Sequence, residues 1–182
     1  MTNIQGNFPK TRLRRNRMKD FSRRLVAENN LSTNDLILPL FVCEGNNIED
    51  PIQSMPGINR YSIDKLLHKV EEAVKLSIPA IAIFPQIETS LKNKEGSLAF
   101  DENNLVCRSI KSIKKEFSNI GIICDVALDP FTDHGHDGLV IDNKIDNDKT
   151  LEVLEKQALV QVHAGCDVIA PSDMMDGRVL KI

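Results

Sequence analysis

Short apolar runs alternate with longer amphipathic stretches along most of the chain. Each apolar run has the length of a buried strand and is bounded by turn-forming residues. We predict strands over residues 36–42, 79–85, 120–128 and 167–175. Because buried strands that alternate with helices are typical of βαβ units, the pattern predicts an α/β fold with a parallel sheet.

Apolar residues at helical spacing fill the stretches between these strands. We predict helices over residues 62–78, 103–119 and 147–166, a short helix near residue 21, and a further helix starting at residue 176. Asp148 or Thr150 would lie near the cap of the helix that starts near residue 147, and Gly165 would end it.

Polar side chains gather directly after several predicted strands. They are Glu44, Gln86, Asp125 with Asp129, and Ser172 with Asp173. A (β/α)8 barrel places its active site at that end of its strands, and no glycine-rich nucleotide-binding motif follows any strand here. Four strand–helix units make up half of such a barrel. We therefore expect the N-terminal half of a (β/α)8 TIM barrel with an extended N-terminal arm.

Charge is distributed unevenly along the chain. Residues 10–24 carry eight Lys or Arg and one Asp, a net +7, so the remainder carries −10 within the total of −3. We expect a basic arm with a short helix over residues 1–34, followed by four βα units of an incomplete barrel over residues 35–182. Docking of the arm on an acidic neighbouring subunit fits this asymmetry better than nucleic-acid binding does.

The apolar runs and the cysteines of the chain bear on where in the cell the protein is expected. No run of about 18 apolar residues is present, so we expect no transmembrane helix, and the N-terminal stretch lacks the apolar centre of a secretory signal. The four scattered cysteines form no C-x-x-C pair. We interpret them as reduced thiols in a cytoplasmic protein.

The stretch DVALDPFTDHGHDG, residues 125–138, crowds acidic and histidine side chains after the third predicted strand. Three interpretations stay open: a polar loop of Asp and Gly turns, a catalytic or substrate-binding loop, or a metal site. The metal site would use Asp129, His134, His136 and Asp137. Since the H-x-H pair lies several residues past the strand, the metal site is the least favoured of the three.

The stretch APSDMMDGR places Ser172 and Asp173 at the end of the fourth predicted strand. Both residues could line a site at that edge of the sheet. Serine and aspartate are also good helix caps, and no G-x-S-x-G nucleophile motif is present, so the stretch alone indicates no particular chemistry.

Several long stretches together resemble one family in order and spacing. They are TRLRRNR, FSRRLVAENNLSTNDLILPLFVCEG, SMPGINRYSID, IPAIAIFP, GIICDVALDPFTDHGHDG and APSDMMDGRV, spread over residues 11–179. These stretches are similar to the porphobilinogen synthase (5-aminolevulinate dehydratase) family. The resemblance implies a lyase that condenses two 5-aminolevulinate molecules to porphobilinogen with loss of water, in heme and tetrapyrrole biosynthesis. It also implies a homo-octamer in which the N-terminal arm wraps a neighbouring subunit.

The resemblance assigns active-site positions to this chain. Asp125, Ser172 and Asp173 match residues that line the family's catalytic pocket. The two lysines that form Schiff bases with the substrates match no position in this chain. We therefore expect the chain alone to be inactive.

The resemblance also bears on metals. Zinc-dependent members hold a catalytic zinc with three cysteines where this chain has Ala127, Asp129 and Asp137, so thiolate-rich zinc coordination is not expected. The chain resembles the zinc-independent branch, often activated by magnesium, a hard cation that prefers oxygen ligands. The allosteric magnesium site would lie outside this chain, and we expect no metal- or cofactor-binding residue within it.

Two other functions stay open. One is a metal-dependent TIM-barrel hydrolase that uses His134 and His136. The other is a non-catalytic subunit that binds a full-length homologue through residues 10–24.

Overall fold

The computed structural model describes residues 6–182, so the first five residues of the predicted arm lie outside the described part. The chain divides into two compact units, Met1–Ser32 and Thr33–Ile182. Among the described residues of the smaller unit, a 3-10 helix η1 (Leu13–Arg17) is followed by the short helix α1 (Asp20–Leu25). No described side chain of this unit is buried, as expected for an arm without a core of its own.

The larger unit is built on a six-stranded sheet in the order β2-β3-β1-β4-β5-β8. The four predicted strands form its main part, as β1 (Ile37–Val42), β4 (Ala80–Pro85), β5 (Gly121–Val126) and β8 (Val168–Pro171). Neighbouring members of this group pair in parallel, which confirms the predicted βαβ order. The unpredicted short strands β2 (Glu49–Pro51) and β3 (Asn59–Tyr61) pair antiparallel with each other, and β3 extends the sheet beside β1.

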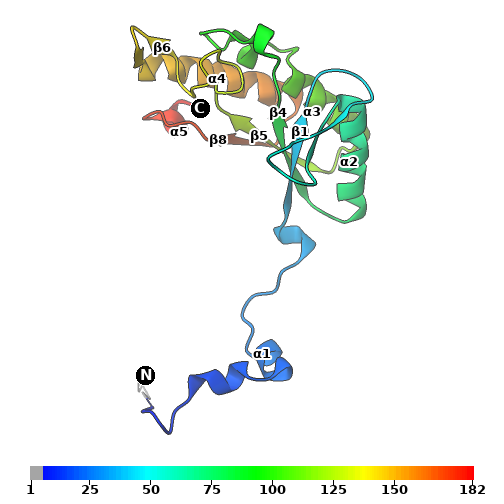
Figure 1. The fold of residues 1–182 in the computed structure, drawn as a ribbon, viewed down its shortest axis with the longest axis vertical. Coiled ribbons are helices and arrows are strands. Elements are labelled where there is room, and N and C mark those ends of the chain that lie inside the picture. The colour runs from blue at the N-terminus through cyan, green and yellow to red at the C-terminus, as the bar shows by residue number, and fades with distance from the viewer. Residues whose placement is uncertain (1–5) are drawn as a thin grey trace. The chain divides into compact units, whose positions relative to one another are not determined.

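Three helices connect the parallel strands and lie along one face of the sheet (Figure 1). They are α2 (Ile63–Lys75), α3 (Leu105–Glu116) and α4 (Asn147–Ala164). A short helix α5 (Arg178–Lys181) follows β8. The N-cap of α4 is Asp146, whose side chain accepts the Lys149 N–H at 3.0 Å, so the cap lies close to the predicted Asp148 and Thr150. Gly165 ends α4 in the left-handed conformation, at φ 109°, as predicted.

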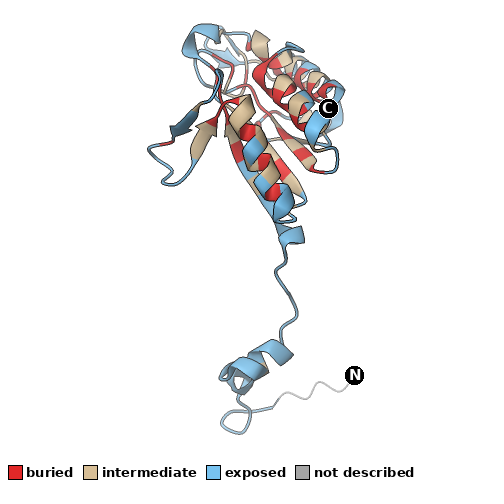
Figure 2. Ribbon diagram, turned by 90° about the vertical axis from the view of Figure 1, so that its right-hand side faces the viewer, coloured by how far each residue is buried: buried red, intermediate tan, exposed pale blue. Residues whose placement is uncertain are grey.

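The two faces of the sheet differ in burial (Figure 2). Side chains that point toward the helices are fully buried, among them Val42, Ile81, Ile83, Ile122 and Val126. On the opposite face the exposed fraction reaches 55% at Ile37 and 49% at Val168. Since successive side chains of a strand alternate between faces, one face forms the core and the other presents apolar residues without a covering helix among those described.

The connection between β5 and α4 contains the two-residue strands β6 (Val140–Ile141) and β7 (Lys144–Ile145). Asp142 and Asn143, which join them, both have positive φ, as a tight hairpin turn requires. The sequence pattern missed this hairpin because strands of two residues show no periodicity. No helix among residues 6–182 is both long enough and apolar enough to cross a membrane.

Candidate active site

Asp125 and Ser172 meet at the carboxyl end of the sheet. Asp125 is the last residue but one of β5, and Ser172 directly follows β8. The parallel register pairs Asp125 with Ala170, which brings the two strand ends side by side. The Ser172 hydroxyl donates a hydrogen bond of 2.6 Å to Asp125 Oδ1. The ladder thus joins two predicted site residues that lie 47 positions apart in sequence.

A pocket of about 340 Å³ opens beside this pair on the uncovered face of the sheet. Its lining consists of Ala82, Phe84, Ile123, Asp125, Ala170, Pro171 and Ser172. Asp125 is the single ionisable side chain in this lining, and it stands among apolar neighbours. A small polar substrate placed here would meet one carboxyl and one hydroxyl against apolar walls.

Burial raises the pKa of the Asp125 carboxyl, and the nearby Asp137 carboxylate raises it further. The hydrogen bond from Ser172 acts in the opposite direction, since it favours the ionised form. Burial also raises the pKa of Asp129, with added repulsion from Asp137 and Asp125, while Lys92 lowers it. The carboxyl edge of the sheet therefore holds several acids that resist simultaneous ionisation, an arrangement typical of acid–base sites.

The structure turns Asp173 away from the pocket that Asp125 lines. Its side chain is buried, with Oδ1 accepting the Met175 N–H at 2.7 Å and Oδ2 lying 3.5 Å from Arg178 Nε. Asp173 still lies close enough to act on the pKa of Asp125. Its direct contacts, with Met175 N and Arg178, stabilise the turn between β8 and α5, which follows Ser172.

The three loop positions that the resemblance matches to zinc-binding cysteines, Ala127, Asp129 and Asp137, differ in their surroundings. Ala127 is buried, and Asp137 is half-buried at the far end of the loop. Asp129 lies just past the strand, where neighbouring atoms partly desolvate its carboxyl although the residue remains exposed to solvent. A methyl group and two carboxylates do not offer the thiolates that tetrahedral zinc prefers.

The histidines of the H-x-H pair contribute to the loop's own hydrogen bonds. His134 Nδ1 accepts the His136 N–H at 3.2 Å, and His136 Nδ1 accepts the Gly138 N–H at 3.0 Å. Within residues 6–182 no three His, Cys, Asp or Glu side chains are grouped so that they could hold a metal ion. These contacts are those of a loop of Asp and Gly turns, and the role of residues 125–138 as a catalytic or substrate-binding loop stays a prediction.

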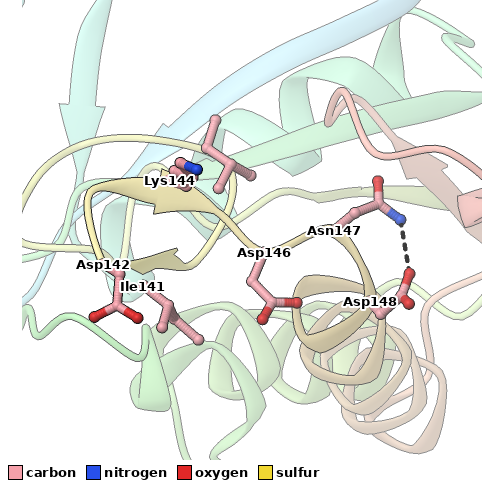
Figure 3. Close-up of a pocket in the computed structure, with 7 residues that line it drawn as sticks. Ile141, Asp142, Lys144, Asp146, Asn147 and Asp148 are labelled. Atoms are coloured by element: carbon pink, nitrogen blue, oxygen red, sulfur yellow. Dashed lines mark hydrogen bonds between the residues drawn. The ribbon is translucent and has the colours of Figure 1, made fainter.

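A larger cavity of about 540 Å³ lies at the β6–β7 hairpin, lined largely by polar residues (Figure 3). Its carboxylates, from Asp142, Asp146 and Asp148, do not point toward one another. Asp146 is engaged as the cap of α4, and Asn147 donates to Asp148 at 3.2 Å. The acidic residues of this cavity are thus accounted for by turn and helix-capping roles.

Sequence reasoning named Gln86 as a polar residue after a strand, but it did not predict the polar side chains that accompany Gln86 or the buried amides of α4. Arg60, Gln86 and Lys92 line a pocket of about 330 Å³ between the ends of β1 and β4, where Arg60 pairs with Asp50 at 3.0 Å. Two buried amides of α4, Gln157 and Gln161, bond to the backbone of residues 125–127. Their one sequence signal is the occurrence of two glutamines, one turn apart, on the helix face that also carries Leu154, Ala158 and Ala164.

Comparison with known proteins matches residues 10–182 to the family model described as delta-aminolevulinic acid dehydratase. A relative of that name from Bradyrhizobium diazoefficiens is 58% identical over 171 residues, which is 94% of this chain and 48% of the relative. Another from Chlamydia pneumoniae is 43% identical over 92% of this chain and 51% of the relative. The chain thus spans about half the length of these curated relatives.

A solved structure gives the same extent of similarity. It is the delta-aminolevulinic acid dehydratase (porphobilinogen synthase) of Toxoplasma gondii ME49, in complex with the reaction product porphobilinogen. It matches at a TM-score of 0.89 and 42% identity, over 93% of this chain and 48% of that chain. The match confirms the predicted fold, half of a (β/α)8 barrel preceded by an arm.

Proposed function

Because the chain belongs to the delta-aminolevulinic acid dehydratase family, we propose that it supplies the Asp125 side of a porphobilinogen synthase active site. The reaction is the condensation of two 5-aminolevulinate molecules to porphobilinogen, with loss of water. The observation that carries this proposal is the hydrogen bond between Ser172 and Asp125 at the carboxyl edge of the sheet, beside a pocket with apolar walls. The Toxoplasma gondii relative, whose structure holds porphobilinogen, supports the same substrate class.

Asp125 is suited to move protons during the condensation. A carboxyl whose pKa is raised by burial keeps its proton at a pH where an exposed aspartate has lost it, which suits it to donate as well as accept a proton. The Ser172 hydroxyl fixes one carboxyl oxygen and thereby orients the group. Loss of water from a condensing carbonyl compound requires such a proton donor close to the departing oxygen.

The proposal needs an electrophilic partner that this pocket does not contain. No lysine is among the residues that line the pocket beside Asp125. By the family resemblance the two Schiff-base lysines belong to the half of the relatives that this chain does not match. We therefore expect the chain by itself to bind substrate weakly and to form no porphobilinogen.

The metals of the family enter the proposal in two ways. Ala127, Asp129 and Asp137 do not fit a thiolate zinc site, so no step of the reaction is assigned to zinc here. Magnesium, as an allosteric activator held outside this chain, is proposed from the resemblance to the zinc-independent branch.

Assembly is proposed to occur through the N-terminal arm, in a cytoplasmic homo-oligomer that is an octamer in the full-length family. The arm exposes Phe8, Leu13, Met18 and Leu25 beside its arginines, with exposed fractions of 74% or more. Such an apolar and basic surface fits an acidic neighbouring subunit, and no contact of the arm is attributed to nucleic acid or membrane.

A chimera tests the proposal. Residues 10–182 would replace the matching half of the Bradyrhizobium diazoefficiens relative, and the product would be incubated with 5-aminolevulinate and assayed for porphobilinogen by colour. We expect turnover by the chimera and none by the 182-residue chain alone. A correctly folded chimera that forms no porphobilinogen would refute the proposed function.

A histidine-to-alanine change separates the metallohydrolase alternative. The His136→Ala chimera is expected to keep its metal content and most of its activity, because His136 Nδ1 is engaged by the Gly138 N–H of its own loop. Loss of a stoichiometric metal on this change would favour the hydrolase instead.

A further inference from the structure

Strand β4 ends in Pro85, a residue without a backbone N–H to give to a neighbouring strand. Gly121 N donates to Pro79 O at 2.9 Å, which sets the phase of the ladder between β4 and β5. In that phase the odd-numbered residues of β5 exchange hydrogen bonds with β4. The donor to the Asp125 carbonyl would be the N–H of residue 85. Because residue 85 is proline, the ladder leaves the Asp125 carbonyl without its strand partner.

Helix α4 supplies the missing donor. Gln161 Nε2 donates to Asp125 O at 2.9 Å, and Gln157 Nε2 donates to Ala127 O at 3.1 Å. Both glutamines have an exposed fraction of 1%. Carbonyls two residues apart on a strand are separated by about 6.6 Å, and side chains four residues apart on a helix by about 6 Å. One helical turn therefore spans the two carbonyls, and α4 extends the interrupted ladder.

The other end of each amide lacks a partner. Gln157 Oε1 and Gln161 Oε1 are buried and accept no hydrogen bond from the described residues. The orientation of both amides is fixed, because a carbonyl accepts only from the NH2 end. Both glutamines line a cavity of about 10 Å³, together with Pro85, Asp125 and Ala127. A cavity of roughly this size holds one water, and a water has two hydrogens to donate.

Asp125 is therefore held from two sides. Its carboxyl meets Ser172 on the open face of the sheet, and its carbonyl meets Gln161 on the helix side. The ladder itself is weakening at this point, since the next bond toward β8, from Ser172 N to Val126 O, is 3.4 Å long. The position of the Asp125 carboxyl consequently depends on the helix as well as on the sheet.

We propose that Gln157 and Gln161 are positioning residues for Asp125, and that their amide oxygens hold one buried water in the cavity behind it. The inference rests on the proposed function only for the catalytic role of Asp125. The two glutamines touch neither the pocket beside Ser172 nor a substrate placed there, so they act through the backbone of the strand end.

Four variants of the whole chain test the proposal. Gln161→Met keeps the size of the side chain and removes the amide, and Gln53→Met makes the same change at an exposed position. Pro85→Ala returns a backbone N–H to the ladder. The double variant Pro85→Ala with Gln161→Met asks whether that N–H replaces the lost amide.

Amide hydrogen exchange and carbon-13 titration of the Asp125 carboxyl are the readouts. We expect Gln161→Met to speed exchange at Asp125 at least tenfold and to move the carboxyl midpoint down toward its ordinary range, as water reaches a loosened strand end. Gln53→Met should change neither quantity. In the double variant exchange should return to within about threefold of the native rate, because the restored backbone N–H at position 85 replaces the lost amide as donor to the Asp125 carbonyl.

The outcomes discriminate sharply between the roles. Faster exchange with an unmoved Asp125 midpoint would show a purely structural tether and overturn the positioning role. A double variant as labile as Gln161→Met would overturn the replacement of the Pro85 donor. Magnetisation transfer from a long-lived water to the Nε2 protons of both glutamines is expected in the native chain, and its absence would overturn the buried water. None of these readouts needs turnover, so they stand or fall apart from the proposed activity.

Discussion

The pKa values of aspartates are shifted in opposite directions at the two edges of the parallel sheet. At the carboxyl edge, burial and mutual repulsion raise the pKa values of Asp125 and Asp129. At the amino edge, Asp167 precedes β8 and accepts hydrogen bonds from Lys114 Nζ at 2.6 Å and from Ile122 N at 2.7 Å. Burial opposes ionisation there too, but these donors hold the pKa of Asp167 below its usual range.

The difference places a stabilising carboxylate at one edge of the sheet and the candidate acid–base carboxyls at the other. The Asp167 carboxylate has its counter-charge and stabilises the folded chain when ionised. The carboxyls at the opposite edge lack a full set of donors, so their ionisation costs stability and leaves them reactive. Barrels of this class generally place catalysis at the carboxyl ends of their strands and stabilising contacts at the other end.

Removal of the Asp125 carboxyl should have the largest effect. In the chimera with the Bradyrhizobium diazoefficiens half, Asp125→Asn is expected to lower kcat by about 10²- to 10⁴-fold, the usual contribution of a positioned acid–base group. The amide keeps the shape of the side chain and can still contact Ser172, so folding should be little affected. Steady-state assays of porphobilinogen formation measure the loss.

The matched change at the amino edge is Asp167→Asn in the same chimera. It should leave kcat within about threefold, because Asp167 lies at the end of the sheet away from the pocket. Equal losses in the two variants would remove the distinction between the edges and point to a general loss of structure.

The sequence predicted the carboxyl edge because its residues follow strands directly. Asp125 and Ser172 could be placed together from the strand pattern alone, since the carboxyl ends of parallel strands share one edge. The inward turn of Asp173 could not be predicted, because a serine–aspartate pair after a strand can direct either side chain to the site. Its burial depends on the Met175 N–H and on Arg178, which are positioned by the turn.

Other features depend on pairing that a sequence does not contain. The role of Gln161 can be recognised only from the strand register. That register places Pro85, which has no backbone N–H, where a donor to the Asp125 carbonyl is needed. The cap of α4 fell on Asp146 because several residues near the start of that helix are good caps, and the preceding hairpin decides which one has the extended backbone.

The next effect in size is on stability at the amino edge. Asp167→Asn should lower the free energy of unfolding by about 1 kcal/mol at neutral pH, since it removes a charged acceptor from Ile122 N and Lys114 in a half-exposed pair. Because the pKa of Asp167 is lower in the folded chain, its contribution is present above about pH 4 and is lost as the pH falls through the folded value. Urea unfolding at neutral and acidic pH measures the difference. If the native chain and Asp167→Asn differed in unfolding free energy by the same amount at neutral and acidic pH, the role of the charge would be contradicted.

The smallest effect, opposite in sign, belongs to Asp129. Its folded pKa is raised by burial and by Asp137 and Asp125, so the folded chain binds this proton more tightly than the unfolded chain does. Ionisation therefore costs stability, and the cost grows as the pH rises above about 4 until it passes the folded value. Asp129→Asn should raise the midpoint of urea unfolding at neutral pH and leave it unchanged below about pH 4. Asp133→Asn, a change at another exposed aspartate of the same loop, is the control. It should leave the midpoint of urea unfolding unchanged at both pH values. If Asp129→Asn instead lowered stability at neutral pH, the carboxyl edge would resemble the amino edge, with its acids held by donors.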